Sequence, residues 1–133
     1  MGTMIDKIAW VRVRNRRMLY VRSKGKDLFY SPGGKRKGNE TDVEALVREI
    51  GEELGVRIIP ETVKYLETFR GQSHGESEGT SVEIACYTAQ CVGEPHAASE
   101  IEEIAWLSSA DRGRTTVVGQ LILDWLAGRG LID

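Results

Sequence analysis

Hydrophobic residues follow two spacings along the chain, and each spacing predicts a different element. Apolar runs of strand length occur at residues 8–13, 18–22, 63–69, 81–92 and 104–107, and they favour β-strands. Helical spacing occurs first at Val43, Leu46, Val47, Ile50 and Leu54, and again from Thr115, at Val117, Val118, Leu121, Ile122, Trp125 and Leu126. Strands on both sides of a central helix, followed by a closing helix, predict an α/β or α+β fold.

Local signals place the boundaries of these elements. Thr41 or Asn39 can cap a helix that begins near Asp42, and Gly55 lies where that helix would end. The polar run 14–17 predicts a hairpin between the first two strands. Before the central helix, the run 31–34 reads Ser-Pro-Gly-Gly, which favours a tight turn with an exposed backbone.

Composition indicates one globular domain that spans residues 1–133. The 133 residues are 41% hydrophobic and 29% charged, with no repeats and no apolar run near the ~20 residues of a membrane span. The N-terminus does not read as a signal peptide, so we expect a cytoplasmic protein with no membrane partner. Cys86 and Cys91 fall in one predicted strand at an odd separation, which points them to opposite faces and argues against a disulfide.

Charge is distributed unevenly. Residues 1–37 hold eleven Lys and Arg against two acidic residues, whereas the rest holds seven basic and 18 acidic residues. A basic segment that leads into an acidic one suits a polyphosphate bridged by cations, although a solvated basic hairpin explains most of these side chains. The chain shows no aromatic platform and no basic helix, so we expect no stable nucleic-acid partner.

The acidic residues of the central helix point to a metal. Glu49, Glu52 and Glu53 are related as i, i+3 and i+4, so their carboxylates crowd the last two turns, near the negative end of the helix dipole. A solvated acidic face is the plain alternative. A divalent cation removes the repulsion, and oxygen-only ligands suit Mg²⁺ or Mn²⁺.

The segment around this helix carries a family signature. Residues 34–56 follow the spacing G-x5-E-x7-R-E-I-x-E-E-x-G-V, which resembles the Nudix box of the MutT-like hydrolases at every defining position. Residues 28–34 and 100–107 also resemble the family. The resemblance implies an α/β/α sandwich with a mixed sheet, and hydrolysis of a nucleoside diphosphate linked to a further group X.

The resemblance also assigns roles. It implies that Glu49, Glu52 and Glu53 ligate the metal, together with the Gly33 backbone carbonyl, and that Glu53 is the first candidate for the general base. Glu100, which falls where several family members place an additional carboxylate, is the second candidate and a further metal ligand.

Other charged residues have supporting or alternative roles. Arg48 is expected to hold Glu52 through an i, i+4 pair, and Glu40 is expected to brace the loop. Arg22 and Lys35 are candidate phosphate contacts, with exposed solubilising charge as the alternative. His74 is expected at the surface, within reach of a substrate.

The short chain favours a MutT-like nucleoside triphosphate pyrophosphohydrolase. The alternatives are a hydrolase of nucleotide sugars or dinucleoside polyphosphates, and a nucleotide-binding Nudix-fold protein without activity. A homodimer through a sheet edge stays open.

Overall fold

The computed structural model describes residues 3–76 and 79–133, and its two helices occur where the helical spacings predict them. In chain order, the elements are β1 (Thr3–Trp10), β2 (Val13–Arg14), β3 (Arg17–Ser23), β4 (Gly33–Gly34), α1 (Asp42–Leu54), β5 (Arg57–Ile58), a 3-10 turn (Pro60–Thr62), β6 (Lys64–Gln72), β7 (Thr80–Thr88), β8 (Cys91–Val92), β9 (Ile101–Leu107), a second 3-10 segment (Ser109–Arg114) and α2 (Val117–Gly128). Two residues between the apolar runs 63–69 and 81–92, Ser77 and Glu78, lie outside the described part.

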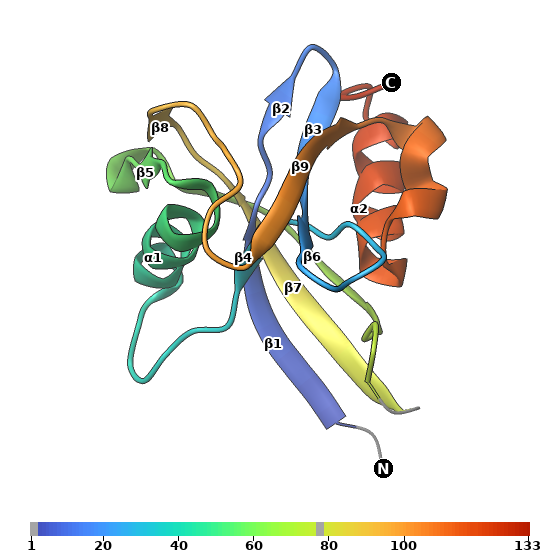
Figure 1. Cartoon of the computed structure of the whole chain (residues 1–133), viewed down its shortest axis with the longest axis horizontal. Helices are drawn as coiled ribbons and strands as arrows, with labels where there is room; N and C mark the ends of the chain where they lie inside the picture. Colours follow the sequence, from blue (N-terminus) through green and yellow to red (C-terminus); the bar gives the residue numbers. More distant parts are fainter. Residues whose placement is uncertain (1–2, 77–78) are drawn as a thin grey trace.

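The strands form a mixed four-stranded sheet and an antiparallel three-stranded sheet. The first has the order β4-β1-β7-β6, in which β1 and β7 are parallel and the other pairs are antiparallel. The second has the order β2-β3-β9, and β5 pairs with β8 in a separate short ribbon. The two helices lie on opposite sides of the strands (Figure 1). This arrangement confirms the predicted α/β/α sandwich with a mixed sheet.

Each helix covers its own hydrophobic core. The core on the α1 side contains Ile8, Trp10, Leu19, Val21, Ala45, Leu46, Ile50, Leu54, Val56, Ile58 and Ile101. The core on the α2 side contains Ala9, Val11, Met18, Tyr20, Phe29, Phe69, Val82, Cys86, Leu107, Val118, Ile122, Leu123, Leu126 and Ile132. Because side chains alternate along a strand, the final residues of β1 supply both cores, which explains why this stretch is apolar without a clear alternation.

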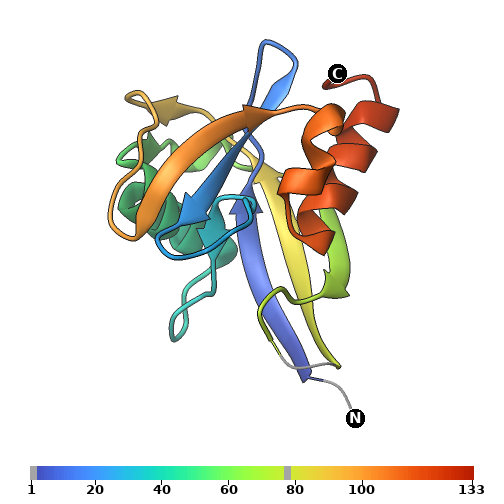
Figure 2. The same cartoon turned by 45° about the vertical axis from the view of Figure 1, so that its right-hand side comes forward.

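The predicted hairpin between residues 8–13 and 18–22 was wrong in its extent. β1 ends at Trp10 and pairs along its whole length with β7, far away in sequence, as Figure 2 also shows. Within residues 8–23, the hairpin joins β2 and β3, and its Asn15 and Arg16 take φ values of 52° and 60°. Positive φ at both central residues matches the right-handed twist of the flanking strands.

The predicted strand 81–92 is also divided. β7 ends at Thr88, and the backbone of Gln90 then bonds to the turn before β6, where Ile59 N donates to its carbonyl at 2.9 Å. The chain crosses over there to form β8 against β5. Cys86 and Cys91 consequently lie on different strands, not on one, and both are free thiols. Within the described residues, no helix is both long and apolar enough to cross a membrane.

Candidate active site

Helix α1 is fixed at both ends by its own sequence. Thr41 is the N-cap: its side chain accepts a bond from Glu44 N, and the Glu44 carboxylate accepts one from Thr41 N, which together form a capping box. Gly55 ends the helix with a φ of 66°, in the left-handed region that favours glycine. These two ends set the register, so Glu49 and Glu53 emerge one turn apart on the face that meets β4.

Two glycines bring the strand edge close to those carboxylates. Gly33 has a φ of +147°, and a Cβ there would lie 2.0 Å from the Ile8 carbonyl oxygen. A Cβ on Gly34 would lie 2.6–2.7 Å from the Glu49 carboxyl atoms. Only glycine allows this approach at both positions. The Gly-Gly pair therefore opens a gap at the sheet edge that the carboxylates fill.

Glu53 is the most constrained of the carboxylates. It is only 3% exposed, and Gly33 N donates to its Oε1 at 3.1 Å. The pKa of Glu53 is raised to about 9, mainly by burial; Glu49 and Glu100 contribute to the rise, while the Gly33 bond and Lys7 oppose it. A carboxyl group that is held in place but disfavours its own charge is suited to a positively charged ligand.

Arg48 links the carboxylates of the box. Its Nε and Nη2 donate to Glu40 at 2.7 and 2.9 Å, and its Nη1 donates to Glu49 at 2.9 Å and to Glu52 at 3.2 Å. A further bond runs to the Lys35 carbonyl at 3.0 Å. The expected contact between Arg48 and Glu52 is present, but the two hydrogen bonds from Arg48 to Glu40 are shorter. Because Glu40 also accepts from Lys37 N at 2.7 Å, this pair ties the loop before α1 to the helix.

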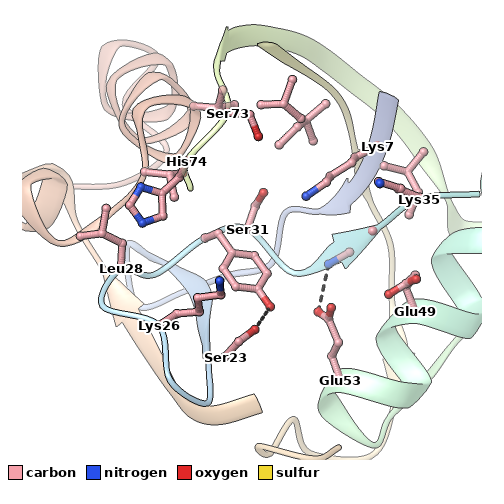
Figure 3. A pocket seen from close by; sticks show the side chains of 18 of the residues that line it. Lys7, Ser23, Lys26, Leu28, Ser31, Lys35, Glu49, Glu53, Ser73 and His74 are labelled. Atoms are coloured by element: carbon pink, nitrogen blue, oxygen red, sulfur yellow. Dashed lines mark hydrogen bonds between the residues drawn. The ribbon is translucent and has the colours of Figure 1, made fainter. Parts of the chain in front are cut away.

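A cavity of about 390 Å³ lies beside β4 and α1. Its charged lining consists of Lys7, Lys26, Lys35, His74, Glu49, Glu53 and Glu100, and its apolar lining includes Leu28, Val82, Ile84 and Val118. Figure 3 shows Glu49 and Glu53 entering from α1, with the ammonium groups of Lys7 and Lys35 pointing into the same space. The cavity therefore brings together five of the expected site residues: Gly33, Lys35, Glu49, Glu53 and Glu100.

Three expected site residues do not line this cavity. Glu52 is half exposed and held by Arg48, which itself stands behind the carboxylates. Arg22 donates to Glu103 at 2.8 and 3.0 Å and to the Lys26 carbonyl at 3.0 Å. These bonds fasten the loop between β3 and β4, and the phosphate contact of Arg22 stays a prediction.

One lining residue was missed from the sequence, and another lies where it was expected. Lys7 was not singled out from the sequence, although a lysine between the apolar positions Ile5 and Ala9 of one strand face was the available signal. His74 was expected at the surface within reach of a substrate. It does line the cavity, where its Nε2 lies 3.1 Å from Asp27 Oδ1 in the opposite loop.

The donors at this site fit a hard divalent cation in chemistry. Glu49, Glu53 and Glu100 offer only oxygen atoms, and a positive ion would offset both the burial and the repulsion that raise the pKa of Glu53. In residues 3–76 and 79–133, no three acidic, histidine or cysteine side chains are gathered closely enough to form a ready-made metal site. Glu52 in particular is turned toward Arg48.

Carboxylate oxygens that can hold a cation and ammonium groups that can bind phosphate oxygens line one cavity, and together they can stabilise the charge that develops when a phosphorus-containing anhydride is cleaved. The sequence profile of the NUDIX domain matches residues 5–120. The chain therefore belongs to the NUDIX family of pyrophosphohydrolases, which generally use divalent metal ions.

Solved structures support the same fold. The E. coli ORF135 protein aligns with a TM-score of 0.73 at 25% identity, over 96% of this chain and 92% of that one. A MutT NUDIX hydrolase from Burkholderia pseudomallei aligns with a TM-score of 0.74 at 24% identity, over 92% and 98%. A UDP-X diphosphatase aligns with a TM-score of 0.68 at 19% identity, over 98% and 65%. Comparison with curated protein sequences gave no match.

Proposed function

We propose that this protein is a Mg²⁺- or Mn²⁺-dependent hydrolase that cleaves the diphosphate linkage of nucleoside diphosphate derivatives, and that its substrate is a nucleoside triphosphate. The products would be a nucleoside monophosphate and pyrophosphate. The observation that carries this proposal is the buried Glu53 carboxyl, set beside Glu49 and Glu100 in a cavity that also holds the ammonium groups of Lys7 and Lys35. Carboxylates for a cation and ammonium groups for phosphate oxygens meet there within one substrate-sized space.

The lining of the cavity supports a nucleotide as ligand. Glu49 and Glu53 of α1 lie on the same side of the cavity as Lys7 and Lys35, whereas Lys26 and His74 lie with Leu28 on the other side (Figure 3). Val82, Ile84 and Val118 provide further apolar surface. An uncharged ring system suits the apolar part, and a phosphate chain suits the charged part. The volume of about 390 Å³ is in the range of small-molecule sites.

The residues divide the chemical work. Glu49 and Glu53 would hold the cation together with Glu52 or Glu100, and Arg48 would keep the first of these oriented through its 2.9 Å bond. The chemistry that the cation supplies when bound is neutralisation of phosphate charge and acidification of the attacking water. A carboxylate, either Glu53 or Glu100, would take the proton of that water. The lysines would bind non-bridging phosphate oxygens of the substrate.

A substrate panel with a metal control tests the proposal. The protein is incubated with common and oxidised nucleoside triphosphates, dinucleoside polyphosphates, nucleotide sugars and nucleoside monophosphates, in Mg²⁺, in Mn²⁺ and in excess chelator. We expect pyrophosphate from triphosphates, and none in chelator. Preferential cleavage of nucleotide sugars or dinucleoside polyphosphates would move the substrate to those classes. Metal-dependent binding without turnover would indicate a non-hydrolytic protein, and phosphate release from monophosphates alone would refute the proposal.

Two conservative variants assign the general base. Glu53→Gln and Glu100→Gln each remove one charge and keep the shape of the side chain. We expect Glu53→Gln to lower kcat by about 10²-fold or more, because it removes a metal ligand and the first candidate base. Near-normal turnover of Glu53→Gln together with an inactive Glu100→Gln would assign the base to Glu100.

A further inference from the structure

Lys7 lies on a face of β1 whose neighbouring side chains are apolar. Along β1, the side chains of Ile5, Lys7 and Ala9 point to one face; Ala9 belongs to the α2-side core and Ile5 packs against it. Across the parallel pair, Lys7 is in register with Ile84, which packs against the same core and lines the cavity. Lys7 is thus a single cation in an apolar row, and its aliphatic stem lies along that row.

Within residues 3–76 and 79–133, the ammonium group of Lys7 has no counter-charge at contact distance. Among the described residues, neither Lys7 nor Lys35 forms an ion pair or a side-chain hydrogen bond, whereas most arginines of this chain are paired with carboxylates. Burial and the nearby Lys35 ammonium both lower the pKa of Lys7 from the ordinary lysine value. Two like charges pointing into one cavity without partners destabilise the empty protein, and an anion removes that cost.

We propose that Lys7, together with Lys35, binds the phosphate that a nucleoside triphosphate carries beyond the diphosphate found in a nucleotide sugar, and that Lys7 thereby selects triphosphates as substrates. This inference rests on the proposed function. Both ammonium groups enter from the side where Glu49 and Glu53 lie, so they reach the phosphate chain and not the uncharged end of a nucleotide (Figure 3). A diphosphate that is joined to a neutral sugar leaves the positive charge of the two ammonium groups without a negative partner. A third phosphate supplies that partner.

The test compares Lys7→Met with the conservative Lys7→Arg and with Lys64→Met. Methionine keeps the apolar stem and removes the charge. Lys64 is an exposed lysine at the start of β6, at the opposite end of that strand from the cavity residues Gln72 and Ser73, so its replacement controls for net charge. KM and kcat are measured for a nucleoside triphosphate and for the corresponding nucleoside diphosphate. Binding of a methylene-bridged triphosphate analogue is measured by calorimetry in Mg²⁺.

We expect Lys7→Met to raise KM for the triphosphate, and Kd for the analogue, about tenfold or more, since one charged contact is lost. KM for the diphosphate should change by less, and kcat for the triphosphate should stay within about threefold, because Lys7 is a binding group. Lys7→Arg should recover part of the affinity, and Lys64→Met should behave as the unmodified protein.

Two further readouts separate binding from a structural role. The melting temperature of Lys7→Met without ligand should be equal to or higher than that of the unmodified protein, because an unpaired ammonium group leaves an apolar row. Mn²⁺ affinity without nucleotide should not fall, since Lys7 repels a cation.

Unchanged analogue affinity in Lys7→Met would overturn the inference, as would equal losses for triphosphate and diphosphate. The inference would also be overturned if the melting temperature of Lys7→Met fell far enough for partial unfolding to explain its loss of analogue affinity. If the unmodified protein cleaves no triphosphate, the proposed function fails, and the analogue titration still reports on Lys7 independently of turnover.

Discussion

Gly34 lies so close to the Glu49 carboxylate that adding one methyl group, in Gly34→Ala, should lower activity strongly while changing stability little. In Gly34→Ala, the new Cβ would lie 2.6 Å from the Glu49 carboxyl carbon, and ordinary contact begins at 3.4 Å. The φ angle of Gly34 is outside the left-handed region, so alanine fits the backbone. The strain therefore falls on the end of a flexible side chain, which has to move by about 0.8 Å, and a shift of about 1 Å at a catalytic group can cost roughly 10²-fold in rate.

We accordingly expect Gly34→Ala to lose about 10²-fold in kcat and to need more Mg²⁺ for half-maximal rate. Its free energy of unfolding should change by less than about 1 kcal/mol, because alanine also lowers the entropy of the unfolded chain. The assay pairs pyrophosphate release over a Mg²⁺ titration with urea unfolding in chelator. Gly113→Ala is the matched control, since its Cβ meets nothing within 4 Å.

Gly33→Ala provides the contrast. Its Cβ would lie 2.0 Å from a backbone oxygen, which cannot rotate away, and its φ of +147° is strained for any other residue. This variant should lose more than about 3 kcal/mol of stability. Full activity of Gly34→Ala, or a stability loss as large as that of Gly33→Ala, would refute the role given to the gap at β4.

Three more predictions follow from contacts of α1. The folded-state pKa of Glu53 is raised from 4.5 to about 9, so this group should stabilise the metal-free protein most below about pH 4.5. That stability should be lost as the pH rises to about 9, by at most about 1.4 kcal/mol per pH unit. Urea unfolding in chelator at several pH values should show this slope, and Glu53→Gln should flatten it. Arg48→Lys should cost about 2 kcal/mol in the same assay, nearly as much as Arg48→Met, because four separate acceptors use the guanidinium fork; a fully stable lysine variant would contradict this. Thr41→Ala should cost about 1 kcal/mol through the lost cap and leave KM unchanged, and a changed KM would show that the cap also positions the site.

The sequence predicted the parts of this structure that local signals determine. Helix α1 was predictable in type and in both ends, because its periodicity, the Thr41 cap and Gly55 agree with one another. The family resemblance supplied the sandwich topology, which spacing alone does not specify. The long parallel pairing of β1 with β7 was not predictable, because partners more than seventy residues apart leave no local trace, and the run 8–13 therefore read as half of a hairpin.

The candidate site shows the same division. Glu49 and Glu53 were identified from helical spacing, but spacing treats Glu52 as their equal, whereas the structure turns it toward Arg48. Arg22 was predicted to contact phosphate because of its charge alone. In the structure it forms an ion pair with Glu103, its neighbour on β9. Lys7 was not predicted as a site residue, because a lysine in a basic N-terminal segment is expected to be exposed to solvent. Only the pairing of β1 with β7 places its side chain in a partly buried row.

The cavity concentrates features that each lower the stability of the empty protein. Glu53 is buried as an acid, Lys7 and Lys35 are unpaired, and Glu49 and Glu53 sit near the negative end of α1. No single ligand relieves all of these costs, because a cation alone leaves the lysines unmatched and an anion alone adds to the charge of the carboxylates. A cation and a polyphosphate bound together relieve all of them at once. We therefore infer that the two ligands bind cooperatively, so Mg²⁺ affinity should rise when the triphosphate analogue is present, by the same factor by which Mg²⁺ raises analogue affinity. Calorimetric titration in both orders measures the two factors, and the variant Lys7→Met should reduce them together.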